Sequence, residues 1–295
     1  MPLINKKVLV SGAEYFNDHD AINALMNSSI PVNTKTAVAE HSKVINAYEE
    51  AGIEVIKVKA PKDCQDGIYT ANWGLVKDGK AILSRLPNKR KAEEPYARQI
   101  LDGLGIKVID LPDDITAFSG QGDAIKIDNV IFTQSPFRTS KEAHKYVKEY
   151  LGLDKVISLK TKPLRWFKIG PKKRNHLTGW VDSPTYDIDL AIAAIKPKIG
   201  TNEPVIAYCP AVFTRKSRKV LNKLKDFDKI KVGKDEALGV FALNLVSTGE
   251  TIIMNMGAPK FKSELIKKGL KVIELSLPEL AKGGGSIRCI SLTLD

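Results

Sequence analysis

The 295-residue sequence has few cysteines and no long hydrophobic run. Its three cysteines, Cys64, Cys209 and Cys289, lie far apart and form no CxxC pair. This argues against a disulfide framework or a cysteine-rich zinc site and favours a reducing compartment. No stretch reaches the roughly 18 apolar residues that a membrane helix needs, and the opening residues, MPLINKKVLVSG, contain no apolar signal segment. We therefore expect a cytoplasmic protein without a membrane partner.

The composition is that of an ordinary globular protein with a surplus of positive charge. Hydrophobic residues make up 43% and charged residues 27%, which is enough apolar material for a large core. The net charge of +12 suits small acids, nucleic acid or a lipid surface. The cations are spread along the whole chain and no RRM or KH signature occurs, which argues against nucleic acid. No linker or low-complexity tract interrupts the sequence, so we expect one domain over residues 1–295.

Short apolar runs alternate with helix-like stretches, which predicts an α/β protein. Units of strand, strand, helix and strand recur about every 50–60 residues, a period typical of a repeated unit, although a doubly wound sheet would produce a similar pattern. The spacing predicts helices over Thr36–Glu50, Glu93–Leu104, Ser140–Tyr150 with Ser140 as N-cap, Thr214–Leu224 and Ser263–Gly269. The predicted strands include Lys7–Ser11, Ala124–Ile127, Val130–Thr133, Tyr186–Ala191 and a hairpin of Ala242–Val246 with Thr251–Met254.

The segment Lys160–Trp180 departs from this pattern. It is basic and aromatic, and Pro163, Gly170 and Pro171 interrupt it. We interpret it as a solvated loop or an extended hairpin. A lid or an anion-binding flap is the alternative.

Cys289 follows three glycines and Arg288 and precedes an alternating strand. A cysteine beside a cation and a flexible loop is placed to have a lowered thiol pKa and to act as a nucleophile. A buried structural cysteine in a terminal strand fits the spacing equally well. The sequence around Cys289 leaves both interpretations open.

Acidic residues form the second candidate site. In the predicted strand Tyr186–Ala191, Asp187 and Asp189 share one face because side chains alternate along a strand. Two carboxylates on an apolar strand are costly unless a cation lies beside them, and a guanidinium would meet that need with bidentate bonds. A strand end open to solvent is the alternative. Asp123, in the turn FSGQGDA, and Asn72 carry further polar groups, each also compatible with a plain turn.

Seven motifs occur in the order found in the amidinotransferase superfamily, and together they span nearly the whole chain. The sequence most resembles the branch of dimethylarginine dimethylaminohydrolases and arginine dihydrolases or deiminases. The resemblance implies a five-bladed α/β-propeller, the pentein fold, built from ββαβ units around a polar centre. The motifs are INALM at 22–26, YTANWG at 69–74, KRKAEEP at 89–95, FSGQGDA at 118–124, FRT at 137–139, YDIDL at 186–190 and GGGSIRC at 283–289.

The resemblance implies hydrolysis of a guanidinium C–N bond, with a small guanidino compound as substrate and no metal or organic cofactor. Cys289 matches the nucleophile, which forms a covalent thiouronium intermediate. Asp189 matches the acid that grips the guanidinium, and Asp123 matches the acid of the Gly-x-Gly-Asp turn. The remaining matches bind substrate: Asn23 and Asn72 contact it, and Arg90 and Arg138 hold its carboxylate.

Two residues depart from the family pattern. Asp187 stands where the family has the histidine that acts as general acid and base, and Ser119 stands where it has glutamate. Asp187 could take over the proton transfer if burial raises its pKa, or His176 could swing in from the basic segment. A pseudoenzyme that binds a guanidino compound and an amidinotransferase are the alternatives.

The other histidines carry no predicted role. His19, His41 and His144 are expected at the surface. A homo-oligomer is compatible with the sequence, which gives no information on assembly.

Overall fold

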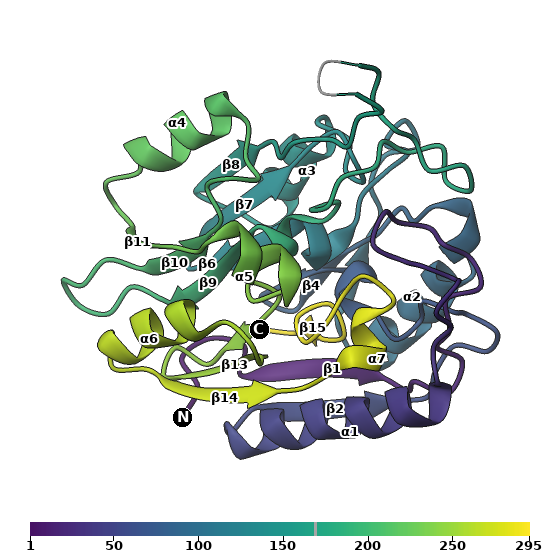
Figure 1. Ribbon diagram of the computed structural model, residues 1–295, viewed down its shortest axis with the longest axis horizontal. Helices are drawn as coiled ribbons and strands as arrows, with labels where there is room; N and C mark the ends of the chain where they lie inside the picture. The colour runs from purple at the N-terminus through teal and green to yellow at the C-terminus, as the bar shows by residue number, and fades with distance from the viewer. Residues whose placement is uncertain (168–169) are drawn as a thin grey trace.

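The computed structural model describes residues 1–167 and 170–295 and confirms the five-bladed α/β-propeller (Figure 1). Each of five sheets has three strands, and in each the middle strand pairs antiparallel with an inner strand and parallel with an outer one. In chain order the sheets contain β1 (Lys7–Ser11), β2 (Glu54–Val58) and β15 (Leu292–Thr293); β3 (Gly74–Lys77), β4 (Lys80–Leu83) and β5 (Lys107–Ile109); β6 (Ala124–Ile127), β7 (Val130–Gln134) and β8 (Lys155–Leu159); β9 (Ile192–Lys196), β10 (Val205–Tyr208) and β11 (Asp228–Lys231); β12 (Val246–Ser247), β13 (Thr251–Asn255) and β14 (Lys271–Leu275).

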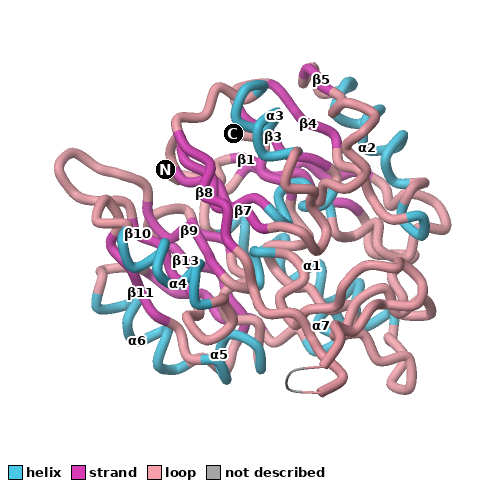
Figure 2. The backbone as a smooth tube through the Cα atoms, turned by 90° about the horizontal axis from the view of Figure 1, so that it is seen from above, coloured by secondary structure: helices cyan, strands magenta, loops and turns pink. Residues whose placement is uncertain are grey.

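A helix joins the middle strand of each blade to its outer strand, because a parallel pair needs a crossover connection. In Figure 2, α2 and α6 lie at opposite outer edges, with sheets between them. The crossover helices are α1 (Thr34–Glu50), α2 (Glu93–Gly103), α3 (Ala143–Tyr150), α4 (Arg215–Lys223) and α6 (Pro259–Lys267); α5 (Lys234–Gly239) and α7 (Pro278–Ala281) link blades.

The inner and middle strands of a blade are joined by short turns where the sequence allows it. Asp78 and Gly79 both have positive φ, +50° and +71°, between β3 and β4. That is the backbone of the two-residue turn preferred in hairpins, and Asp-Gly is a favoured pair there. The predicted hairpin around Asp128 is likewise confirmed as β6 and β7.

The two ends of the chain close the ring together. β15 is the inner strand of the first blade and pairs antiparallel with β1, with Val8 opposite Thr293 (Figure 1). The first blade therefore takes its inner strand from the end of the chain.

Each helix buries one apolar face against its blade. On α2, Ala97 and Leu101 are fully buried against the sheet of β3 and β4. A Leu101→Ala change would cost about 2–5 kcal/mol of stability, because it leaves a cavity in this core.

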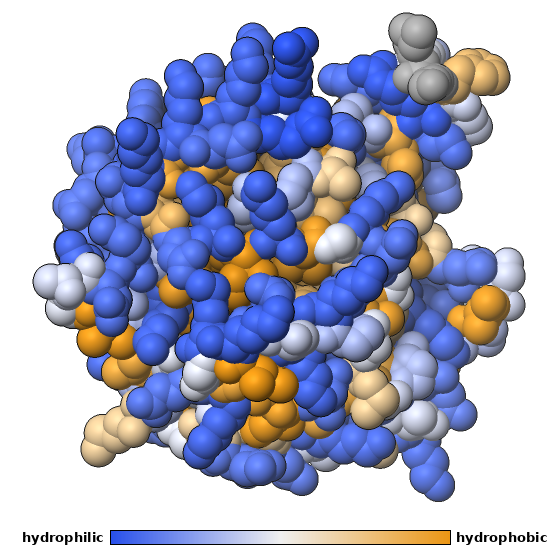
Figure 3. All heavy atoms as spheres, turned by 60° about the vertical axis from the view of Figure 1, so that its left-hand side comes forward, coloured by the Kyte–Doolittle hydropathy of each residue, from blue (hydrophilic) through white to orange (hydrophobic). Residues whose placement is uncertain are grey.

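Hydrophilic residues cover most of the face shown in Figure 3, with smaller apolar areas between them. Among the described residues, no helix is long and apolar enough to cross a membrane.

Three expected elements differ from the structure. Helix α3 begins at Ala143 rather than near Ser140, and Ser140 contributes its carbonyl oxygen to a turn instead of a side-chain cap. The predicted strand Ala242–Val246 shortens to β12, because Phe241 has a positive φ and Asn244 ends a turn. The stretch 188–190 is a 3-10 turn. At the last two of these places the alternation of apolar and polar residues predicts a strand, and it cannot distinguish a strand from a turn that buries its polar groups.

The prediction that His41 lies at the surface is also wrong. It lies on α1 as predicted, yet it is 5% exposed, and no hydrogen-bond partner for its Nε2 lies among the described residues. Burial lowers its pKa to about 4.

Candidate active site

Five turns meet at the axis of the propeller, and each leads into the inner strand of one blade. Because every inner strand enters the barrel in the same direction, the turns before them converge at one end. Each turn carries a polar side chain that is almost completely buried: Asn72 before β3, Asp123 before β6, Asp189 before β9, Asn244 before β12 and Cys289 before β15. The fold therefore collects one polar group from every blade.

Cys289 lies between two of these groups. Its Sγ donates a hydrogen bond to Oδ2 of Asp189 over 3.1 Å and accepts one from Nδ2 of Asn244 over 3.0 Å. The amide oxygen of Asn244 accepts the backbone N–H groups of Ser286, Arg288 and Cys289. One side chain thus fixes both the turn and the sulfur atom.

Two glycines make room for the sulfur and the neighbouring carboxylate. A Cβ atom at Gly285 would lie 2.9 Å from Sγ of Cys289, and one at Gly122 would lie 2.7 Å from Oδ2 of Asp187. Both contacts are too short for a side chain. The glycine-rich sequence therefore serves close approach, as expected from the pattern around Cys289.

The environment of Cys289 favours the protonated thiol, contrary to the lowered pKa that the sequence pattern suggested. Burial raises the pKa of Cys289 well above its ordinary value, and the charge of Asp189 adds to this. Burial and the charge of Asp187 raise the pKa of Asp189 to about 7. The positive charge of Arg288 does not offset these effects; its guanidinium donates to Gln121 and to the carbonyl oxygen of Ser291 and makes no hydrogen bond to the sulfur.

Asp187 is held by two hydrogen-bond donors from other turns and by an ion pair from a loop. Asn72 Nδ2 donates to its Oδ2 over 2.9 Å, and Ser119 Oγ donates to its Oδ1 over 2.9 Å. Arg138 Nη1 lies 3.7 Å from Oδ2. The predicted proximity of Asp187 and Asp189 is present, and both face the same buried space as Cys289.

Asp123 is the least satisfied of the acids. Its Oδ1 accepts the backbone N–H of Ile188 over 3.0 Å, while no partner for its Oδ2 lies among the described residues. Burial, together with the charge of Asp187, raises the pKa of Asp123 well above its ordinary value. Both effects favour the protonated form of Asp123.

Arg90 has a protein partner for most of its N–H groups. Nε and Nη2 donate to the carboxylate of Glu93 over 2.7 Å each, and Nη1 donates to Oδ1 of Asn72 over 2.9 Å. Nη2 also donates to the carbonyl oxygen of Asp66. In this arrangement Arg90 orients Asn72, which in turn donates to Asp187.

Arg138 stacks on aromatic rings at the edge of the cluster. Its guanidinium lies 4.0 Å from the ring centre of Tyr186 and 5.9 Å from that of Trp180. Nη2 donates to the carbonyl oxygen of Ile22 over 3.3 Å. Arg138 thus links the segment around Asn23 to Asp187.

Asn23 lies over the glycine-rich loop. Its Nδ2 donates to the carbonyl oxygen of Gly283 over 3.0 Å, so Asn23 holds the loop that leads to Cys289. His176 is different: it is exposed, in the segment 170–182, and no hydrogen bond joins it to the cluster within residues 1–167 and 170–295. Asn175 beside it donates to the carbonyl oxygen of Ala21. The structure therefore brings together all the predicted site residues except His176.

Two residues of the cluster were not singled out from the sequence. Asn244 lies in the turn before β12, and Glu93 opens helix α2. A careful superposition of the five repeats would have found Asn244, because each other turn has a polar residue one to three positions before its inner strand. Glu93 carries no such signal, since acidic residues are common in the first turn of a helix.

Within the described residues, no three histidine, cysteine, aspartate or glutamate side chains are grouped so that they could hold a metal ion.

Comparison with known proteins gives matches along most of the chain. The model of the family "N,N dimethylarginine dimethylhydrolase, eukaryotic" matches residues 13–165. The N(G),N(G)-dimethylarginine dimethylaminohydrolase of Mycobacterium tuberculosis is 28% identical over 275 residues, which cover 93% of this chain and 81% of that protein.

A second kind of relative is longer. The bifunctional arginine dihydrolase/ornithine cyclodeaminase ArgZ of Synechocystis is 28% identical over 291 residues. The match covers 97% of this chain and 37% of ArgZ.

Solved structures of the N-terminal domain of ArgZ, an arginine dihydrolase, align over 98% of the chain with TM-scores of 0.82–0.83 and 27% identity. They include complexes with substrate and with product. A dimethylarginine dimethylaminohydrolase structure, at 17% identity and a TM-score of 0.68, shares the fold.

Proposed function

Since the family model matches more than half of its residues, the chain belongs to the N,N-dimethylarginine dimethylhydrolase family, and we propose that it hydrolyses a guanidinium C–N bond of arginine or an arginine derivative through Cys289. The relatives with named activities act on dimethylarginine or arginine. We propose the cytoplasm as its location, because three free cysteines are typical of a reducing compartment.

One observation carries this proposal: the 3.1 Å hydrogen bond from Sγ of Cys289 to Asp189, in a buried cluster with unsatisfied carboxyl oxygens among the described residues. A buried acid without a counter-charge is costly, and a flat cation with several N–H donors would satisfy it. Asp123 and Asp189 each have one such oxygen among the described residues. A guanidinium is the cation whose donors fit two carboxyl groups at once.

The cation would also activate the thiol. Its positive charge takes the place of the proton on Asp189, which lowers the pKa of both Asp189 and Cys289. The thiol proton is transferred to a carboxylate of the cluster while sulfur forms a bond to the guanidinium carbon. The departing nitrogen then takes that proton as its C–N bond breaks, leaving a thiouronium on Cys289.

Water completes the cycle. It attacks the thiouronium carbon, a carboxylate of the cluster accepts one of its protons, and the C–S bond breaks to restore the protonated thiol and release a urea-type product. Asp187 is the carboxylate that we propose for this transfer, because Ser119 and Asn72 fix both its oxygens and it occupies the position of the family's histidine.

The test is turnover with arginine, methylarginines and agmatine, following citrulline, ornithine, ammonia and amine release. Wild type should release product and Cys289→Ala should not, while Cys209→Ala, a buried cysteine outside the cluster, serves as the matched control. Mass spectrometry of an acid-quenched reaction should show the guanidine adduct on Cys289. Turnover that survives Cys289→Ala would refute the proposal.

A second function is favoured by one specific feature. The oxygens of Asp187 are already engaged by Ser119, Asn72 and Arg138, which leaves less room for a water or a substrate nitrogen to contact them. A pseudoenzyme that binds a guanidino compound without hydrolysing it would have this arrangement.

The double variant Asp187→His with Ser119→Glu separates the two functions, because it restores the residue types of the family. If wild type binds guanidines without turnover and the double variant turns them over, the chain is a binding protein. If wild type turns them over and the double variant is slower, Asp187 is the working base.

A further inference from the structure

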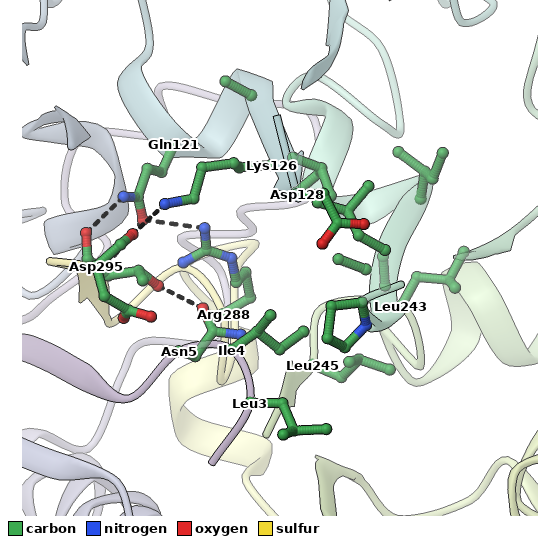
Figure 4. Close-up of a pocket in the computed structure, with 18 residues that line it drawn as sticks. Leu3, Ile4, Asn5, Gln121, Lys126, Asp128, Leu243, Leu245, Arg288 and Asp295 are labelled. Carbon is green, nitrogen blue, oxygen red and sulfur yellow. Dashed lines mark hydrogen bonds between the residues drawn. The ribbon is translucent and has the colours of Figure 1, made fainter. Parts of the chain in front are cut away.

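A cavity of about 220 Å³ lies along the inner strands (Figure 4). Its wall includes residues that follow these strands, such as Asp128 after β6 and Asp295 after β15, and residues that precede them, such as Leu243 before β12 and Arg288 before β15. Neither Cys289 nor the acids of its cluster line it, so the cavity is distinct from the proposed reaction site. Its size suits a molecule smaller than a typical drug.

Arg288 reaches into this cavity. Its side chain is 8% exposed and donates to two uncharged acceptors, Gln121 Oε1 over 3.0 Å and the carbonyl oxygen of Ser291 over 3.1 Å. The other two buried arginines, Arg90 and Arg138, pair with carboxylates. Within the described residues Arg288 has no ion pair. A buried guanidinium without a counter-ion is costly, and a carboxylate is its best partner.

The other charged groups of the wall decide what kind of carboxylate fits. Lys126 donates to a backbone oxygen of Asp295, and the side-chain carboxylate of Asp295 accepts the backbone N–H of Lys7 over 3.4 Å, so both acidic groups of Asp295 have partners in the protein. Asp128 remains, exposed at the rim, with its carboxylate on the side of the cavity opposite the Arg288 guanidinium (Figure 4). A simple anion would be repelled by Asp128. A ligand with one negative and one positive group would satisfy both ends.

The surface between the two charges is apolar. Leu3, Ile4, Leu243 and Leu245 form it, the first two from the segment before β1 and the others from the turn before β12 (Figure 4). The N-terminal segment is held there by hydrogen bonds from Leu3 and Ile4 to the carbonyl oxygen of Thr248. A short aliphatic side chain would be buried against these residues.

We propose that this cavity binds the zwitterion of a small apolar α-amino acid, with its carboxylate on Arg288, its ammonium facing Asp128 and its side chain against the leucines. The site is separate from the guanidine site. It also shares backbone with it, since Arg288 and Leu243 are the chain neighbours of Cys289 and Asn244. The proposal does not depend on the chain being an active hydrolase.

Isothermal titration calorimetry of the full chain with L-leucine tests this proposal. We expect saturable binding with one site per chain. Isocaproate, which lacks the ammonium, isoamylamine, which lacks the carboxylate, and inorganic phosphate should each bind at least about tenfold more weakly, since each lost charged hydrogen bond is worth about 1.5–3 kcal/mol.

Variants assign the binding to the cavity. Arg288→Gln keeps hydrogen-bonding groups but removes the charge, and should weaken leucine binding by more than about tenfold. Arg288→Gln also removes hydrogen bonds within the fold, so Ala194→Phe, which fills the cavity from β9, provides an independent block. Asp128→Asn should lower the preference for leucine over isocaproate, while the exposed Asp114→Asn is the matched control and should have no effect.

The outcomes that overturn the proposal are distinct. Absence of saturable leucine binding to wild type refutes it, as does binding that Ala194→Phe leaves unchanged. Loss of leucine binding in Cys289→Ala would place the amino acid in the guanidine site instead. Binding that survives Cys289→Ala supports the cavity, whether or not the chain turns over guanidines.

Discussion

The two halves of the central cluster treat buried charge in opposite ways. In one half Arg90 and Glu93, 2% and 1% exposed, satisfy each other through two hydrogen bonds, and Trp73 donates a third to the carboxylate. In the other half Asp123 and Asp189 each keep an oxygen without a partner among the described residues. The half with the Arg90–Glu93 pair has matched charges and serves a structural role. The unpaired half lacks a positive charge, which is what a guanidinium substrate would supply.

Breaking the pair should have the largest effect on stability. Glu93→Gln leaves the buried Arg90 without its counter-charge, and we expect a loss of about 3–5 kcal/mol in the free energy of unfolding. Urea unfolding monitored by circular dichroism measures it. The double variant Arg90→Met with Glu93→Gln is the control and should recover much of the loss. Equal stability of wild type and Glu93→Gln would mean that the pair is not a structural element.

Removing an unpaired acid should have the opposite effect on stability and a strong effect on turnover. The folded-state pKa of Asp189, about 7, lies above its ordinary value of 3.8. The unfolded chain releases this proton first, so stability is lost as pH rises from about 4 through about 7. Asp189→Asn removes that loss and should stabilise the protein at pH 8 by up to about 4 kcal/mol.

The same variant should lower kcat/KM for a guanidine by about 10²–10³-fold, since it removes a group that binds and transfers protons to the substrate. Thermal unfolding at pH 5 and pH 8 and steady-state kinetics provide the two measurements. A variant that is less stable at pH 8 would contradict the contrast between the halves.

His41 provides a comparison outside the cluster, as a buried base with an unpartnered nitrogen among the described residues. Its pKa falls from 6.5 to about 4 on folding. The unfolded state therefore binds the proton more readily, and stability present above pH 6.5 is lost as pH falls towards 4. The loss should be about 3 kcal/mol. Thermal melts of His41→Leu between pH 4 and pH 7 should show a flatter profile than wild type; identical profiles would refute this origin.

The smallest expected effect concerns the hydrogen bond from Ser119 to Asp187. Ser119→Ala removes one of the two side chains that donate a hydrogen bond to this carboxylate, at a cost of about 1–2 kcal/mol. The carboxylate of Asp187 is then oriented less firmly, so kcat for a guanidine should fall by about tenfold. Ser119→Thr keeps the hydroxyl and should restore the wild-type kcat. An unchanged kcat in Ser119→Ala would remove Asp187 from the proton transfer.

The blade pattern was predictable because it depends on local signals. Apolar runs, the Asp-Gly turn at 78–79 and the helical spacing of α1 and α2 each report on a few neighbouring residues. The membership of the cluster was predictable through the resemblance, which named Cys289, Asp189 and Asn72 before their contacts were known. One domain over residues 1–295 remains a prediction.

The protonation of the Cys289 thiol and the hydrogen-bond partners of the buried arginines could not be predicted from the sequence. Arg288 stands beside Cys289 in sequence, yet its side chain points to a different cavity, so the expected low thiol pKa was wrong. The resemblance implies that Arg90 binds a substrate carboxylate. In the structure, the guanidinium of Arg90 donates to the carboxylate of Glu93, three residues further on. Such facts depend on side-chain directions and on desolvation by distant blades, neither of which a one-dimensional pattern contains.

The closure of the first blade by β15 joins segments that are far apart in the sequence. β1 and β2 lie within residues 7–58, whereas their inner partner β15 is Leu292–Thr293, so this blade cannot be complete until position 293 has been translated. Cys289 precedes β15 by three residues, so its sulfur joins the cluster after the other four turns have been synthesised. A chain that stops before position 289 would contain the acids and amides of the cluster without the thiol.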